Sequence, residues 1–164
     1  MAPLYGIVTD DFNQDGNLDI AISGNDFGTE VVTGRYDALN GLVMLGDGKG
    51  NFAPQSLAQS GLFIPGDGKA LIRLRSGNKG YLLAASQNRG PLKIFSGKMT
   101  WQKIIPLQSG DKSVLITLAN GQIRKDELYY GNSFLSQSSR FIGMNASMVK
   151  VEVVNGRNEK RILK

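Results

Sequence analysis

Short apolar or alternating segments recur along the whole chain, and Gly, Asn, Asp and Pro separate them. Such runs between turn-forming residues predict β-strands joined by tight connections. No segment keeps a helical period over three turns, so we expect a nearly all-β fold. The expected strands include YGIVT, LDIAIS, GLVML, KALIRL, YLLAAS, PLKIF, QKIIPL, SVLITL and VKVEVV.

Two parts of the chain align as an internal repeat. GNLDIAISGN (16–25) aligns with KGYLLAASQN (79–88), and the segment 41–57 aligns with 91–107. Each copy reads as four short strands, and the first copy carries about 13 additional residues, within DFGTEVVTGRYDAL (26–39). Four antiparallel strands repeating at this spacing are typical of propeller blades. We therefore expect two blades within 1–107, at about 4–60 and 66–107.

The pattern changes after residue 107. Two Asn-Gly pairs, in LANGQI and VVNGRN, lie between alternating runs and predict hairpins. Residues 108–164 are interpreted as a separate small β module. Four aromatic residues in or near it suggest a sugar-stacking platform or, more commonly in a small β module, core packing. They are Trp101, Tyr129, Tyr130 and Phe134.

The stretch DFNQDGNLDI places oxygen-bearing side chains at alternate positions. Counting Asp11 as position one, Asn13, Asp15 and Asp19 fall at positions three, five and nine, and Asn17 at seven offers its backbone carbonyl. Calcium loops alternate their ligands in this way because the chain curls around the ion. The spacing favours a Ca²⁺ site over an ordinary polar turn, although Asp, Asn and Gly are also common turn formers.

Two further positions define the type of loop. Gly16 falls at position six, where the chain turns sharply, and Ile22 falls at position twelve, where a helical calcium hand requires Glu. Strand-like segments flank the loop, so we expect a calcium hairpin of modest affinity. The equivalent stretch of the second copy, RSGNKGY (75–81), has no carboxylate and is not expected to bind metal.

Composition removes several classes of function. Cys and His are absent, which excludes thiol nucleophiles, imidazole bases and the usual zinc ligands. Ser136, Ser138 and Ser139 lie near Arg140 but lack a base, so we expect structural hydrogen bonds there and no enzymatic activity. No apolar run approaches the roughly 20 residues of a membrane-spanning helix.

Charge is distributed unevenly along the chain. Residues 1–60 hold two basic against eight acidic residues, and the remainder holds seventeen basic against six acidic residues. The basic residues are scattered, often on alternate strand positions, rather than clustered with aromatics as nucleic-acid binding requires. We therefore expect solvated strand faces and no nucleic-acid partner.

DFNQDGNLDI followed by LGDGKGNF resembles the FG-GAP or VCBS repeat of integrin-type β-propellers. GNSFLSQSSRF followed by VKVEVVNGRNEKRIL resembles the ASPIC/UnbV module found after such propellers, with Phe134 in place of the family's Tyr. The first resemblance implies calcium ligands at Asp11, Asn13, Asp15, Asn17 through its carbonyl, and Asp19. It also implies that the chain is the carboxyl-terminal piece of a longer propeller protein.

These inferences define the expected function. We expect a calcium-binding, non-catalytic scaffold for a protein or glycan ligand, in a secreted, periplasmic or cell-surface protein. The alternative is an architectural cap of a propeller hydrolase or lyase whose catalytic groups lie in upstream blades. Exposed sheet edges also predict self-association of the fragment.

Overall fold

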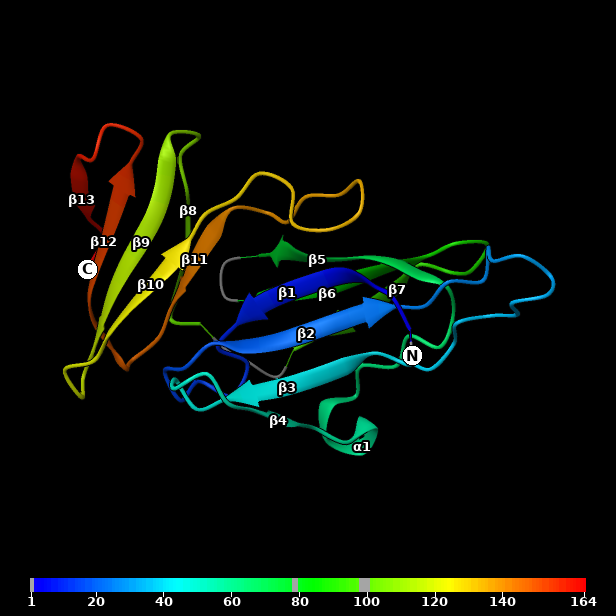
Figure 1. The fold of residues 1–164 in the computed structure, drawn as a ribbon. Coiled ribbons are helices and arrows are strands. Elements are labelled where there is room, and N and C mark those ends of the chain that lie inside the picture. Colours follow the sequence, from blue (N-terminus) through cyan, green and yellow to red (C-terminus); the bar gives the residue numbers. More distant parts are fainter. Residues whose placement is uncertain (1, 78–79, 98–100) are drawn as a thin grey trace.

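The computed structural model describes residues 2–77, 80–97 and 101–164, and in these residues almost all regular structure is antiparallel β (Figure 1). The all-β prediction is confirmed. The first sheet has the order β1-β2-β3-β4. Its strands are β1 (Leu4–Asp10), β2 (Asp19–Gly24), β3 (Leu42–Gly46) and β4 (Phe52–Pro54). Consecutive strands pair as neighbours, as expected for the first repeat copy.

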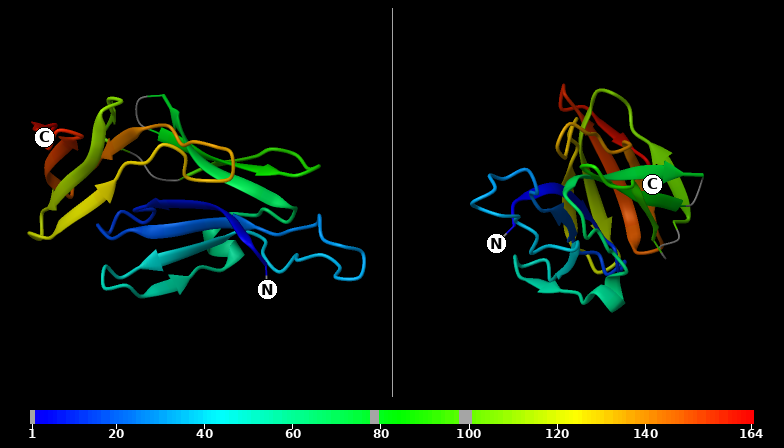
Figure 2. Two further views of the ribbon diagram at one scale, coloured as in Figure 1. Left: turned by 45° about the horizontal axis from the view of Figure 1, so that its top comes forward. Right: turned by 90° about the vertical axis from the view of Figure 1, so that its right-hand side faces the viewer.

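The second repeat copy forms a three-stranded sheet of order β5-β6-β7. Its strands are β5 (Gly68–Ser76), β6 (Gly80–Gln87) and β7 (Lys93–Ser96). This sheet lies behind the first sheet, and Figure 2 shows the two as layers. Val8 and Ala21 of the first sheet and Leu71 and Ala85 of the second are buried in one shared core.

The expected fourth strand of the second copy pairs elsewhere. β8 (Lys103–Pro106) forms a separate two-stranded sheet with β11 (Phe141–Met144), although sequence analysis placed these strands on opposite sides of a boundary at 107. Trp101 explains the difference, because its buried ring stacks on Tyr81 with centroids 6.4 Å apart and lies against Gly143 of β11. This packing carries the chain away from β7. Residues 98–100 of the expected repeat lie outside the described residues.

The remaining strands form a four-stranded sheet of order β10-β9-β12-β13, hereafter the C-terminal sheet. They are β9 (Asp111–Leu118), β10 (Ile123–Glu127), β12 (Met148–Asn155) and β13 (Lys160–Ile162). Both Asn-Gly pairs lie in connections between antiparallel neighbours, which confirms the two hairpins. Figure 1 shows this sheet at one end of the two layers.

The expected insertion of the first copy forms the connection between β2 and β3. Residues 30–38 are exposed, and one isolated bridge joins Asp26 to Tyr36. The single-turn helix α1 (Leu57–Ser60) follows β4 and begins at a capping box of Ser56 and Gln59. In the described ranges, no helix has the length and apolarity needed to cross a membrane.

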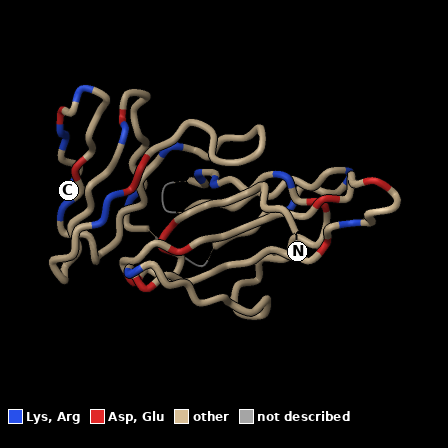
Figure 3. Tube along the Cα trace, viewed as in Figure 1, with Lys and Arg blue, Asp and Glu red and all other residues tan. Residues whose placement is uncertain are grey.

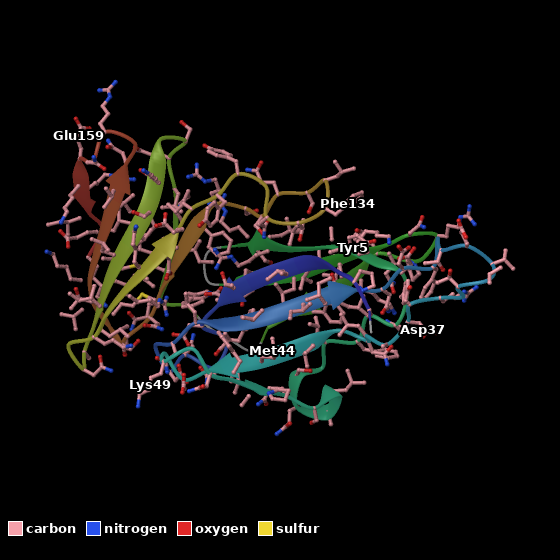
Figure 4. All side chains as sticks on the ribbon, in the orientation of Figure 1. Tyr5, Asp37, Met44, Lys49, Phe134 and Glu159 are labelled. Atoms are coloured by element: carbon pink, nitrogen blue, oxygen red, sulfur yellow. The ribbon has the colours of Figure 1, made fainter. Side chains whose placement is uncertain are left out.

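The outward face of the β1–β4 sheet is apolar. The strand registers place Ile7 beside Ile22, Ile20 beside Met44, and Ile22 beside Leu42 on this face. Ile7 is 43% exposed, and no described segment covers the sheet around Met44 (Figure 4). One side of this sheet therefore packs on β5–β7, whereas its other side carries apolar residues of which Ile7, Ile20 and Met44 are partly exposed and Ile22 is buried.

Candidate metal centre

Residues 11–19, which are the loop between β1 and β2 together with the first residue of β2, hold all five predicted ligands. Asp11 and Asp19 are fully buried at its two ends, whereas Asn13 and Asp15 are exposed at its tip and Asn17 is half-buried. Strands flank the loop on both sides, as predicted. The antiparallel pairing of Asp10 with Asp19 brings the two buried carboxylates to the same end of the hairpin.

Asp11 has one occupied and one free carboxylate oxygen. Its Oδ2 accepts a hydrogen bond from the Gly16 amide at 3.0 Å, and its Oδ1 is buried without a hydrogen-bond partner. A buried oxygen anion without a donor is costly unless a cation or water satisfies it. This oxygen is therefore free to accept a hydrogen bond or to ligate a cation.

Asp19 is held by backbone donors. Its Oδ2 accepts a hydrogen bond from the Phe12 amide at 2.8 Å, and its Oδ1 accepts one from the Gly46 amide at 2.9 Å. These bonds fix the carboxylate between the loop and the end of β3. A carboxylate oxygen has more than one lone pair, so each oxygen can also ligate a metal.

Asn13, Asp15 and Asn17 form a hydrogen-bonded turn. Asn13 Nδ2 donates to Asp15 Oδ2 at 2.8 Å, the Asp15 amide donates to Asn13 Oδ1 at 3.1 Å, and the Asn17 amide donates to Asp15 Oδ1 at 2.8 Å. Within the part of the chain that the structure describes, no group of three or more acidic, His or Cys side chains is spaced to hold a metal. Ligation of a metal by Asn13 and Asp15 would require them to give up the hydrogen bonds between them.

Burial shifts the ionisation of the two inner carboxyls. The pKa of Asp11 is raised because burial disfavours the anion, and the nearby guanidinium of Arg124 opposes the rise. The pKa of Asp19 is raised for the same reason, and the Gly46 and Phe12 amides oppose it. For both carboxyls the desolvation of the anion outweighs the hydrogen bonds and charges that stabilise it. A bound cation would therefore reduce the free-energy cost of keeping these carboxylates ionised.

Gly16 is required by both conformation and space. Its φ of 98° lies in the left-handed region that favours glycine, and an ideal Cβ there would lie 2.6 Å from Leu118 Cδ1. Leu118 ends β9, so the sharp turn of the loop packs directly against the C-terminal sheet. Sequence analysis predicted the turn and did not predict this contact.

Arg124 of β10 also reaches the loop. Its Nη1 donates to the Gly16 carbonyl at 2.9 Å and lies 3.4 Å from Asp11 Oδ2. The alternating charges of RKDEL (124–128) fit the pattern for which a solvated strand face was expected. That interpretation holds for Lys125 and Glu127, whereas Arg124 and Asp126 point inward and are only 10% and 22% exposed. The alternation of side chains along β10 indicated that the strand has two faces, but it did not indicate which face packs against another sheet.

Asp10, the residue before the first predicted ligand, is buried. Its Oδ2 pairs with Arg73 Nη1 at 2.6 Å, and its Oδ1 accepts a hydrogen bond from the Asp11 amide at 2.9 Å. Asp10 therefore supports the backbone of the first predicted ligand. The equivalent turn of the second copy includes Gly77, and its positions 78–79 lie outside the described residues.

The predicted aromatic cluster divides into two groups. Trp101 belongs to the core, but Tyr129, Tyr130 and Phe134 are each more than half exposed, so the core prediction is wrong for these three. Phe134 packs edge-on against Tyr5 with centroids 6.0 Å apart (Figure 4), and Arg140 stacks on Tyr130. These rings form an exposed aromatic segment beside β1.

Of the serines expected to make structural hydrogen bonds, Ser138 does so, whereas Ser136 Oγ is buried without a hydrogen-bond partner. Ser138 Oγ accepts a hydrogen bond from the Arg73 amide at 2.9 Å, and Ser133 Oγ donates to the Leu71 carbonyl at 2.8 Å. Both contacts attach the segment to the edge of β5. Figure 3 shows Lys and Arg spread over several sheets.

Comparison with known proteins adds no relative. The chain matches no model of a known protein family, and neither a curated protein nor a solved structure is detectably similar to it. The loop and its surroundings are therefore the features of the molecule that bear on its function.

Proposed function

We propose that this chain is a calcium-stabilised, non-catalytic β scaffold that binds its ion in the 11–19 loop. The buried, unpartnered Oδ1 of Asp11 is the observation that carries the proposal. Two buried carboxyls whose pKa values are raised by burial add to it, because a divalent cation would stabilise their ionised forms. The alternating oxygen pattern of the loop is chemically suited to Ca²⁺.

The ligands would be Asp11, Asn13, Asp15, Asn17 through its carbonyl, and Asp19. Calcium supplies positive charge and flexible coordination to oxygen, and its role here is structural. The backbone helps to hold the site, because the Gly16, Phe12 and Gly46 amides orient the two buried carboxylates. Because the exposed ligands must first give up their mutual hydrogen bond, we propose modest affinity, in the roughly 10⁻⁴ to 10⁻³ M range of extracellular modules.

The scaffold role rests on the exposed aromatic segment. Tyr129, Tyr130 and Phe134 present apolar rings with polar neighbours, a chemistry that suits protein or glycan surfaces. The resemblance to FG-GAP or VCBS repeats and to the ASPIC/UnbV module supports a secreted, periplasmic or surface location, where millimolar calcium would fill such a loop. A glycan array and a cell-surface protein screen would test this role, and uniformly negative results would count against it.

The alternative function is architectural, and the apolar outer face of the β1–β4 sheet favours it. A further sheet packed over Ile7, Ile20 and Met44 would bury this face, as neighbouring blades do in a propeller. Under this alternative the isolated chain should self-associate through the face, and Met44→Lys should shift it toward monomer in sedimentation analysis. A monomeric wild type at high concentration would argue against the cap.

Thermal unfolding with and without calcium tests the primary proposal. Calcium should raise the melting temperature of the wild type, and Asp15→Ala should abolish the rise because it removes a ligand from the exposed tip of the loop. Asp37→Ala is the matched control, since it removes an exposed carboxylate from the 26–39 connection, far from Lys49 and the loop (Figure 4). Superimposable melting curves in calcium and in chelator would refute the proposal.

A further inference from the structure

Arg124 joins the C-terminal sheet to the acidic loop through several directed contacts. Its Nη1 donates to the Gly16 carbonyl at 2.9 Å and approaches Asp11 Oδ2 at 3.4 Å. The contact spans 113 residues of sequence. Arg124 therefore touches both the turn of the loop and its first predicted ligand, and it leaves Asp11 Oδ1 free for an ion.

The charge of Arg124 is balanced within its own strand. Asp126 accepts hydrogen bonds from Arg124 Nε at 3.0 Å and from Nη2 at 3.2 Å, a two-pronged pairing that fixes the guanidinium. The Arg124–Asp126 pair is neutral as a unit, so it presents N–H donors to the loop with little net repulsion toward a bound cation. Its main effect on the loop should be positional.

Leu118 provides a second contact from the same hairpin. It lies at the end of β9, is 3% exposed, and packs where a Cβ on Gly16 would be. One apolar and one charged side chain of the β9–β10 hairpin thus hold the same residue of the loop. If metal binding shifts the turn at Gly16, the contacts with the β9–β10 hairpin must change. Displacement of the hairpin must in turn remove two contacts that restrain the turn.

We propose that calcium binding in the 11–19 loop and docking of the β9–β10 hairpin stabilise each other, with Arg124 as the positioning residue that couples them. This inference rests on the proposed calcium site. Because coupling between two equilibria is reciprocal, calcium should tighten the hairpin against the loop and the docked hairpin should tighten calcium binding. Arg124 acts on the ion only through Gly16 and Asp11.

Hydrogen exchange of the wild-type chain tests the coupling directly. Amides of the loop and of β9 and β10 are followed with added CaCl₂ and with chelator. We expect calcium to slow exchange in both regions, although they are far apart in sequence. Slower exchange in the loop alone would overturn the coupling and leave the calcium site standing. No calcium effect in either region would refute the calcium site and the coupling with it.

Paired variants test the role of Arg124. Arg124→Gln removes the positioning contacts, and Lys125→Gln removes the same charge from the next residue, which points outward and is paired with Glu127. We expect Arg124→Gln to weaken calcium binding by about fivefold or more and to remove the calcium-dependent protection of the hairpin. Lys125→Gln should stay within about twofold of wild type.

The sign of the affinity change decides between two roles of the guanidinium. Tighter calcium binding by Arg124→Gln would show that Arg124 competes with the ion as a cation, and unchanged binding would show that it is irrelevant; either result overturns the proposal. Circular dichroism confirms that each variant is folded at the temperature of titration. If Arg124→Gln does not fold, the wild-type exchange pattern decides the question.

Discussion

Asp11 combines complete burial with a free carboxylate oxygen, and this combination sets how the loop responds to pH. Its pKa and that of Asp19 are raised above the ordinary value of 3.8. A carboxyl with a raised folded-state pKa contributes stability below its unfolded pKa and loses it as pH rises through the folded pKa. Without calcium, these two residues should therefore destabilise the fold toward neutral pH.

Calcium should reverse that loss, because it binds the ionised carboxylates. We expect the rise in melting temperature produced by calcium to be small near pH 4 and to grow as pH increases through the raised pKa values of Asp11 and Asp19. Scanning calorimetry between about pH 4 and about pH 7, with and without calcium, measures the increment. A calcium effect of constant size across this range would contradict the prediction.

Gly16 offers a second prediction for a single residue. Gly16→Ala should lower the free energy of unfolding by roughly 2 kcal/mol or more, because alanine is strained at a φ of 98° and its Cβ would overlap Leu118. Gly50→Ala is a useful control, since its φ is 95° and no atom lies within 4 Å of an added Cβ. Urea unfolding of both variants separates strain from overlap. Equal losses would show that Leu118 does not restrict the site.

Among the elements, β8 shows where prediction from sequence reached its limit. The strand character of β8 and the β1–β4 meander follow from the local alternation of apolar and polar residues, which can be read directly from the sequence. The choice of β11 as the partner of β8 does not follow from local alternation. The pairing depends on Trp101, which stacks on Tyr81 and lies against Gly143, and only the fold brings these residues together. Nothing in the spacing of Gly143 distinguishes it from a turn glycine.

The same limit applies to the candidate site. Asp11, Asn13, Asp15, Asn17 and Asp19 were identified because they lie in one short stretch whose pattern is local. Arg124 and Leu118 were missed because they approach the loop from a distant hairpin. Arg124 and Asp11 are 113 residues apart, so the residue spacing within the loop or within β10 does not indicate their contact.

The packing of Trp101 on β11 predicts the effect of a small substitution. Gly143→Ala should destabilise the protein by about 1 to 3 kcal/mol, because the added methyl group would overlap the Trp101 ring in a packed core. Gly110→Ala is the control, since no atom lies within 4 Å of an added Cβ there. Chemical denaturation followed by Trp101 fluorescence measures both. A neutral Gly143→Ala would show that the β8–β11 sheet is not held by this contact.

At the scale of the whole molecule, Arg73 connects three sheets. It lies on β5, pairs with Asp10 of β1 at 2.6 Å, and stacks over the ring of Phe141 on β11 at 4.5 Å. Burial opposes its charge, and Asp10 keeps the pKa of the guanidinium above its ordinary value. The pair therefore fixes how the two layers meet the C-terminal part of the chain.

Removing this link should affect the entire fold. Arg73→Met should cost about 3 kcal/mol of unfolding free energy, because the buried carboxylate of Asp10 would lose its partner. Arg75→Met, two residues along the same strand and exposed, should be nearly neutral. Adding Asp10→Asn to Arg73→Met should recover part of the loss. If the double variant is no more stable than Arg73→Met, the unpaired charge is not the cause.

The long sequence separation between Arg124 and the acidic loop has a consequence for the order of events during folding. The β1–β4 hairpins contain only local pairings, but their negative loop meets the Arg124 guanidinium only when the distant β10 docks. Before the Arg124 guanidinium arrives, calcium bound at the proposed site could offset the charge of the loop, so we expect calcium to accelerate refolding of the chain. Refolding monitored through the single Trp101 would reveal this as a calcium-dependent rate, and equal rates in chelator would exclude it.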